Sequence, residues 1–233
     1  MALCLLLILN NKNMQSRFKR KEGARRENKI IYIFTEGEKT EPIYFEFKKK
    51  NIESEIRRRG IKIEVRGTGF NTLSLVDFAL DYVKSNNIDL SLDDCWIVFD
   101  KDDFNKDFDN AINKAQSHGL KVAYSNESFE LWFLLHFHFI DSAITRNDYC
   151  NKLTDNYRKQ TGDKKYKYTK SDNKKRLQES VTLLINLIQD KEINAIKRAK
   201  QLIAQTSNEK SFLKKNPSTT VYVLVEALNK LRS

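Results

Sequence analysis

Two short apolar runs that end in acidic residues place the strongest constraint on how this chain can fold. Lys29–Phe34 (KIIYIF) leads into Thr35 and Glu36, and Cys95–Phe99 (CWIVF) leads into Asp100. Short continuous runs of β-branched and aromatic residues are typical of strands that are buried on both faces of a parallel sheet. We therefore predict two such strands, each with a carboxylate at its carboxyl end.

The rest of the first 145 residues alternates between strand and helix patterns. Gly37 permits the tight turn from the first strand into a helix. Thr40 is the predicted N-cap of that helix, and Pro42 suits its first turn. Further strands are predicted at residues 61–66 and 120–124, and further helices at residues 71–85, 108–118 and 129–139. Strands that alternate with helices form parallel sheets with crossover helices, so the predicted fold class is α/β.

The chain changes in character after Thr145. Residues 146–233 contain few aromatic residues and many Lys and Asn, with helical patterns at residues 180–189, 195–205 and 221–231. Only two prolines occur in the chain, so no proline-rich linker separates this part from the first. We predict three parts: a basic N-terminal arm (residues 1–28), an α/β core (residues 29–145), and a mostly helical basic region (residues 146–233) packed on that core.

Charge is distributed unevenly along the chain. The net charge is +11; residues 151–233 contain 19 Lys and Arg against 8 Asp and Glu, whereas residues 30–150 are acidic overall. An acidic centre attracts metal ions and basic flanks attract phosphate, so the pattern is typical of a metal-dependent enzyme that acts on nucleic acid. Solubility in a lysine-rich proteome is the alternative explanation for the charge alone.

Cysteine usage and hydropathy favour the cytoplasm. The three cysteines, Cys4, Cys95 and Cys150, form no CxxC pair, which speaks against a structural zinc site and a disulfide framework. The apolar first ten residues are too short to span a membrane and lack the features of a signal peptide. We expect translation to begin at Met14, which would make residues 1–13 an extension of the gene model; a short amphiphilic anchor is the alternative.

The predicted strands bring polar and acidic residues to one edge of the sheet. In open parallel sheets, ligands bind at the carboxyl ends of the strands. Three strands are followed by such residues: Glu36 and Glu41 after the first, Asp100, Asp102 and Asp103 after the second, and Ser125, Asn126 and Glu130 after the third. We expect these side chains to converge on one site.

Carboxylates that are held close together repel one another unless a cation lies between them. Mg²⁺ prefers oxygen ligands, and such an ion can polarise a phosphoryl oxygen and lower the pKa of bound water. Asp100 and Asp102 suit one metal ion, with Glu36 as a further ligand or general base, and Lys39 and Lys101 would neutralise phosphate charge. We therefore predict a Mg²⁺ or Mn²⁺ site whose catalytic residues are Glu36, Asp100 and Asp102.

Several of these features also have a purely structural explanation. An Asp-x-Asp-Asp run after a strand often precedes a helix, and Glu130 would suit the first turn of its helix through the helix dipole. His136 and His138 lie on a strongly aromatic segment, where packing is the stronger expectation. Tyr166 and Tyr168, which lie among lysines, would either stack on nucleic-acid bases or belong to a disordered basic loop.

Four stretches of the chain together resemble the RloB-like family. They are IIYIFTEGEKTEPIYF at residues 30–45, WIVFDKDDF at residues 96–104, VAYSNESFELWFLLHF at residues 122–137 and NPSTTVYVLVEAL at residues 216–228. Their order and spacing also match, and the resemblance covers nearly all of residues 15–231. One departure is Glu127-Ser128, where the family would have smaller residues, and it leaves the acidic positions unchanged.

The resemblance implies a Toprim-related fold and a role in bacterial antiphage defence through abortive infection. In Toprim proteins, a Glu after the first strand and an Asp-x-Asp after a later strand carry metal and catalysis, and Glu36, Asp100 and Asp102 match these positions. Asp103 also follows the family pattern, and Glu130 would complete a second metal site. The resemblance further implies an ABC- or SMC-like ATPase as a partner protein.

Two classes of function follow from these observations. The first is a Mg²⁺- or Mn²⁺-dependent nuclease that acts on DNA or RNA as the effector of the ATPase, away from any membrane. The second is a non-catalytic module that binds nucleic acid or docks on a partner and so inhibits host functions. No Walker-type glycine loop and no dinucleotide-binding fingerprint occur, which speaks against nucleotide binding of those kinds. DNA and RNA, and monomer and oligomer, stay open alternatives.

Overall fold

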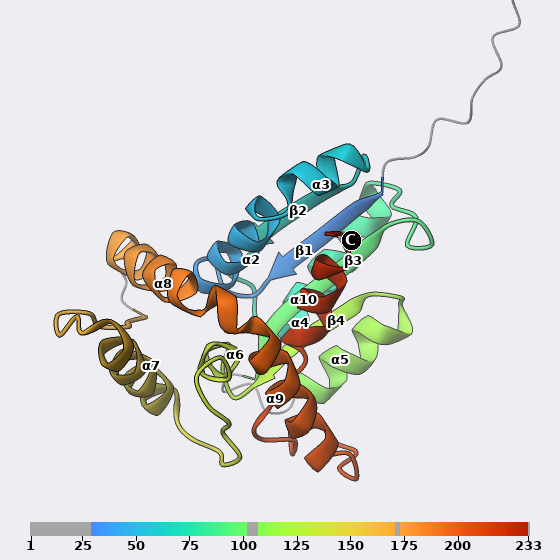
Figure 1. Cartoon of the computed structure of the whole chain (residues 1–233). Helices are drawn as coiled ribbons and strands as arrows, with labels where there is room; N and C mark the ends of the chain where they lie inside the picture. The colour runs from blue at the N-terminus through green and yellow to red at the C-terminus, as the bar shows by residue number, and fades with distance from the viewer. Residues whose placement is uncertain (1–28, 102–106, 171–172, 233) are drawn as a thin grey trace, which may run out of the picture.

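Helices cover both faces of a five-stranded sheet (Figure 1). The computed structural model describes residues 29–101, 107–170 and 173–232 of the chain. The predicted basic arm (residues 1–28) and two predicted metal ligands, Asp102 and Asp103, lie outside the described residues.

The sheet has the strand order β2-β1-β3-β4-β5. Four strands run parallel: β1 (Ile30–Thr35), β2 (Lys62–Gly67), β3 (Asp94–Asp100) and β4 (Lys121–Asn126). The two-residue β5 (Ser218–Thr219) pairs antiparallel with the end of β4. β1 and β3 lie inside the sheet with helices on both faces, which explains their unbroken apolar sequences. The predicted α/β class is confirmed, and the arrangement is consistent with a Toprim-like core.

Alternating strand side chains divide the core into two layers. Tyr32, Phe34 and Ile97 belong to the layer under α4 (Thr72–Ser85) and α5 (Phe108–Ser117). Ile33 and Val98 belong to the opposite layer. The helices that contribute to this second layer are α2 (Thr40–Lys50), α3 (Glu53–Arg58), α6 (Glu130–Leu134), α7 (Arg146–Thr161), α8 (Lys174–Ile188), α9 (Glu192–Gln205) and α10 (Val221–Asn229).

The C-terminal region packs against the strands and helices of the first part. Leu184 of α8 and Leu224 of α10 lie in the same buried cluster as Ile33 and Trp132. The turn η1 (Gln189–Lys191) joins α8 to α9. α8 contacts α2, β5 extends the sheet, and α7 lies away from the strands and contacts α6 (Figure 1). The two parts thus meet in one buried cluster, whereas a domain boundary at residue 146 stays a prediction.

Two helix predictions and one strand differ from the structure. The helix predicted at residues 129–139 is only the five-residue α6, and its apolar run reflects burial on all sides rather than helix length. Thr40 is not the N-cap of α2, because Lys39 takes that position and no side chain caps the helix. Residues 218–219 lie just before the helix pattern at residues 221–231 and form β5, which was not predicted, because the edge of β4 offers them backbone partners.

α7 was not predicted, although its start carries a local signal. The Thr145 hydroxyl accepts a hydrogen bond from the backbone N–H of Asp148, and the Asp148 carboxylate accepts one from the backbone N–H of Thr145. This reciprocal pair is a capping box, here with Asp in place of the usual Glu or Gln. No helix in the part of the chain that the structure describes is long and apolar enough to cross a membrane.

Candidate functional site

The order of the strands creates a crevice at the carboxyl ends of β1 and β3. From β1 the chain passes through α2 and α3 to β2, which is the neighbour of β1 on one side of the sheet. From β3 it passes through α5 to β4, which lies in the opposite direction across the sheet. The connections that leave β1 and β3 therefore diverge, and ligands bind at such switch points in open α/β sheets. A pocket of about 550 Å³ lies at this position.

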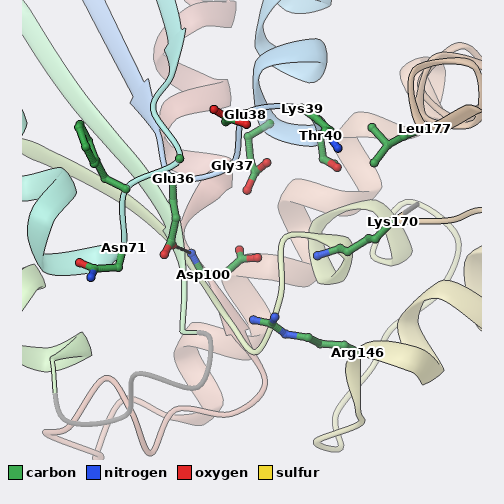
Figure 2. A pocket seen from close by; sticks show the side chains of 13 residues that line it. Glu36, Gly37, Glu38, Lys39, Thr40, Asn71, Asp100, Arg146, Lys170 and Leu177 are labelled. Carbon is green, nitrogen blue, oxygen red and sulfur yellow. Dashed lines mark hydrogen bonds between the residues drawn. The ribbon is translucent and has the colours of Figure 1, made fainter. Parts of the chain in front are cut away.

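Four regions of the chain line this pocket. The chain after β1 supplies Glu36 and the residues up to Glu41, the loop after β2 supplies residues 69–71, β3 supplies Asp100, and the C-terminal region supplies Arg146, Lys170 and Leu177. Figure 2 shows the Asp100 carboxylate and the Lys170 ammonium pointing toward each other, with the Arg146 guanidinium beside them. The sheet edge thus forms an acidic wall, and the C-terminal region forms a basic wall opposite to it.

Glu36 is held against the end of β3. Its backbone N–H donates to the Val98 carbonyl at 2.9 Å, and its carboxylate accepts hydrogen bonds from the Asp100 backbone N–H at 3.1 Å and from the Thr72 hydroxyl at 3.4 Å. Burial raises the pKa of Glu36 to about 7, and the charge of Glu41 adds to the rise against these hydrogen bonds. The carboxyl therefore titrates near neutral pH, where a general base would operate.

Asp100 is a buried carboxylate with an unsatisfied oxygen. Its exposure is 7%, and its Oδ1 atom has no hydrogen-bond partner among the described residues. Burial, followed by the charge of Glu41, raises the pKa of Asp100 well above its ordinary value. A buried anion without a partner is costly, so this atom is well suited to a cation.

Glu41 completes the acidic wall through a close contact with Gly37. A Cβ on Gly37 would lie only 2.1 Å from Oε2 of the buried Glu41. The structure does not place Gly37 in the left-handed region, where Gly60 and Gly69 lie. The glycine is therefore needed because the Glu41 carboxylate occupies the space of a side chain, and not for the tight turn that the sequence suggested.

Glu130 lies deeper than the pocket wall and is fully buried. Its Oε1 accepts a hydrogen bond from the Tyr168 hydroxyl at 2.8 Å, and its Oε2 contacts the Ser128 hydroxyl and the Lys170 ammonium, the latter at 2.9 Å. Burial alone would raise the pKa of Glu130, but Lys170 and the two hydroxyls hold it below its ordinary value. Glu130 is thus an anion whose two oxygens both have protein partners.

Three predicted site residues point elsewhere. Lys101 forms an ion pair with Glu127 at 2.9 Å and does not line the pocket. The buried Ser125 hydroxyl bonds to that of Thr219 at 2.9 Å, which fastens β5 to β4. The buried Asn126 amide donates at 3.0 and 2.8 Å to the carbonyls of two residues in the loop before β5, Phe212 and Leu213. Ser125 and Asn126 therefore bind other parts of the chain.

Sequence reasoning missed Arg146 and Lys170 as pocket residues. Both lie in the basic C-terminal region, which was expected to bind phosphate only in a general way. The neighbouring Tyr166 and Tyr168 are buried, so they neither stack on bases nor lie in a disordered loop. Their alternation with the exposed Lys167 is a period-two pattern, which is the signal that indicates a segment with one buried side.

The described residues support a metal site only in part. No group of three or more His, Cys, Asp and Glu side chains within the described ranges could hold a metal ion. Glu36 and Asp100 nevertheless suit a divalent metal, because both supply oxygen donors and one Asp100 oxygen lacks a partner. Asp102 and Asp103 would have to complete the ligands from outside these ranges, and the metal site stays a prediction.

Comparisons with known proteins identify the family. The family model described as RloB-like protein matches residues 31–228. This range contains all of the residues that line the pocket. Comparisons with curated proteins and with solved structures gave no match. Because the family model covers most of its length, the chain belongs to the RloB-like family.

Proposed function

We propose that this protein is a metal-dependent nuclease that cleaves phosphodiester bonds of DNA or RNA in the pocket at the ends of β1 and β3. The observation that carries the proposal is the buried Asp100 carboxylate, which has an unsatisfied oxygen beside Glu36 and faces a wall that contains Lys170 and Arg146. Carboxylates with cations opposite suit a metal ion and a phosphodiester that bind together.

Each wall of the pocket has its own role in this proposal. Glu36 and Asp100 would hold Mg²⁺ or Mn²⁺, and the chemistry that such an ion supplies when bound is polarisation of a phosphoryl oxygen and a lower pKa of bound water. Glu36, whose pKa is raised to about 7, would hold or accept a proton near neutral pH. Arg146 and Lys39, which also line the pocket, would orient the negatively charged backbone.

We further propose that the nuclease acts in bacterial antiphage defence as the effector of an ABC- or SMC-like ATPase. Membership of the RloB-like family supports this role, because resemblance to that family implies a part in antiphage defence through abortive infection. An uninfected cell would survive the presence of this nuclease if cleavage began only when the partner detects infection. Activity is therefore best measured both with and without the ATPase.

The test is a cleavage assay with matched variants. Purified protein is incubated with plasmid DNA, single-stranded DNA and total tRNA in Mn²⁺, Mg²⁺ or EDTA, with and without the partner. We expect cleavage in metal and none in EDTA. Asp100→Asn should slow cleavage at least about a hundredfold, since even residues that only orient metal ligands cost 10- to 100-fold.

Asp94→Asn is the control for this assay. Asp94 lies at the opposite end of the same strand, β3, where it forms partly buried ion pairs with Lys29 and Lys121, away from the pocket. This variant loses one carboxylate from β3 but leaves the pocket intact, so it should cleave like the wild type. Circular dichroism checks that both variants are folded. An equal loss of cleavage in both variants, or unchanged cleavage by Asp100→Asn, would contradict the proposed site.

One observation favours the non-catalytic alternative. The pocket already contains cations from the chain itself, and Lys170 lies close enough to the acidic wall to offset its charge without a metal. A module of this kind would bind nucleic acid in EDTA and would inhibit growth of the host with Asp100→Asn in place. Retained toxicity of that variant, without cleavage of any substrate, would favour the binding module over the nuclease.

A further inference from the structure

Lys170, whose ammonium points toward the Asp100 carboxylate in Figure 2, is held by a buried network. Glu130 has no exposed surface, and three donors satisfy its two oxygens: Ser128 before α6, and Tyr168 and Lys170 from the segment between α7 and α8. Burial of an ionised carboxylate is costly unless charge and hydrogen bonds compensate for it. The fold therefore retains a buried anion whose charged partner reaches into the pocket.

The segment that carries Lys170 is itself held in place. The Tyr166 hydroxyl donates to the Ser180 carbonyl at 2.9 Å, and the Tyr166 ring stacks on that of Tyr157 with centroids 3.6 Å apart. The Tyr168 backbone N–H donates to the Thr154 hydroxyl at 3.0 Å. Because α7 and α8 both hold this segment, the position of Lys170 is set by several independent contacts.

The two members of the ion pair differ in their exposure. The Lys170 side chain is 38% exposed and lines the pocket, whereas the Glu130 side chain is 0% exposed. A lysine that served only to neutralise Glu130 would be most effective if it were covered as well, because water screens the attraction. An ammonium that is anchored on one side and open on the other can contact a ligand without leaving its anchor.

The charges around Lys170 indicate what that ligand is. Asp100 and Glu41 lie on the opposite side and would repel an anion that arrived alone, while Arg146 and Lys39 add positive charge to the lining of the pocket. A phosphodiester with a divalent cation satisfies both walls, since the cation meets the carboxylates and the phosphate oxygens meet the ammonium.

We infer that Lys170 binds a phosphate oxygen of the nucleic-acid backbone inside the pocket, and that Glu130 is a positioning residue that aims the Lys170 ammonium at it. The inference rests on the proposed function, because it assigns a substrate contact within the same site. It also gives Glu130 a different role from the metal ligand that the sequence suggested. No covalent step is assigned to either residue.

The first test measures binding with a divalent cation present, because the acidic wall would repel nucleic acid without one. Fluorescence anisotropy with short labelled DNA and RNA is recorded over a range of salt concentrations in Ca²⁺, which takes oxygen ligands as Mg²⁺ does and separates binding from Mg²⁺-dependent cleavage. Lys170→Met should weaken binding about tenfold, the cost of one charge-assisted hydrogen bond. It should also make the slope of log affinity against log salt shallower by about one, as expected for one lost phosphate contact.

Lys167→Met is the matched control, because Lys167 lies in the same segment, is exposed and does not line the pocket. It should retain nearly wild-type affinity and slope. If both variants lose the same affinity and slope, the effect is one of general charge and the inference is wrong. If neither variant changes the slope, Lys170 is only a counter-ion of Glu130 and the inference is also wrong.

The second test distinguishes a positioning role of Glu130 from metal binding, and it includes a variant designed to fold even if Lys170→Met does not. Lys170→Met leaves Glu130 buried without a cation, so the double variant Lys170→Met/Glu130→Gln restores neutrality. If Glu130 acts through Lys170, the double variant should bind nucleic acid no more weakly than Lys170→Met alone. Glu130→Gln by itself should weaken nucleic-acid binding. It should leave Mn²⁺ affinity, measured by calorimetry, within about threefold of the wild type, below the 10- to 100-fold cost of removing even an outer-shell partner of a metal. A larger loss of Mn²⁺ affinity would show that Glu130 acts on the metal site and would overturn the positioning role.

Failure of the inference is distinguishable from failure of the proposed function. Wild-type protein that cleaves and binds nucleic acid, with a Lys170→Met variant that binds equally well, would overturn the inference alone. Wild-type protein that neither binds nor cleaves any nucleic acid, with the partner present, would overturn the proposed nuclease and the inference with it.

Discussion

Replacement of Glu36 by Gln should stabilise the metal-free protein at pH 8 and have little effect on its stability near pH 5. The carboxyl is held in the fold by the Asp100 backbone N–H and the Thr72 hydroxyl, and Gln offers an oxygen to the same donors. The variant therefore removes the charge with a small change in shape. The prediction concerns the cost of keeping Glu36 ionised in a buried position without a cation.

The magnitude follows from the pKa of Glu36, which burial raises from 4.5 to about 7. Because the folded pKa is above the unfolded one, the folded protein retains a proton that the unfolded chain releases between these pH values. The free energy of unfolding therefore falls as pH rises through this window and is lowest above pH 7. One pKa unit corresponds to about 1.4 kcal/mol, so the wild type should lose on the order of 2 kcal/mol between pH 5 and pH 8 through this group.

The assay is urea denaturation in EDTA at both pH values. All other titrating groups contribute to both proteins, so the quantity compared is the difference between wild type and Glu36→Gln at each pH. Glu46→Gln is the control, because Glu46 is an exposed carboxylate of α2 that pairs with Lys49 on the surface. The reasoning is refuted if Glu36→Gln declines in stability between pH 5 and pH 8 as much as the wild type and the control do.

Three further predictions test the metal, the packing of the loop and a distant ion pair. Mn²⁺ at a hundredfold excess over its Kd should raise the Tm of the wild type at pH 8 by about 5 °C or more, as measured by differential scanning fluorimetry. The Tm of Asp100→Asn should not change, and equal Tm shifts in the two proteins would show that the ion binds elsewhere. Gly67→Ala should lower the free energy of unfolding, measured by urea denaturation, by about 1–3 kcal/mol, because its Cβ would lie 2.8 to 2.9 Å from atoms of Glu38 and Gly37 in the loop after β1. An unchanged midpoint of urea unfolding would show that this loop moves aside at little cost. Lys48→Met should cost about 3–5 kcal/mol, because it leaves the Glu192 carboxylate without its cationic partner in a largely buried ion pair of 2.6 Å. Lys49→Met on the surface should cost less than about 0.5 kcal/mol, and similar costs for the two variants would contradict the buried-pair argument.

The sequence alone was sufficient to bring Glu36 and Asp100 together. The continuous apolar runs of β1 and β3 predict two buried strands, and the carboxyl ends of neighbouring parallel strands meet at one edge of a sheet. Only the residue type, its place after a strand and a general rule of topology are needed for this step. The same reasoning predicted the α/β class without any knowledge of how the helices pack.

The basic wall of the pocket was decided by tertiary structure. Lys170 meets Glu130 across forty residues of sequence, whereas Lys101, which directly follows Asp100, turns away to Glu127. Asn126 likewise follows a strand but binds the carbonyls before β5. Which way a side chain turns depends on the nearest partner that satisfies its charge or hydrogen bonds, and that partner is brought near only when distant segments pack. Strand patterns are local properties of a sequence, but the pairing of polar side chains is a property of the folded chain.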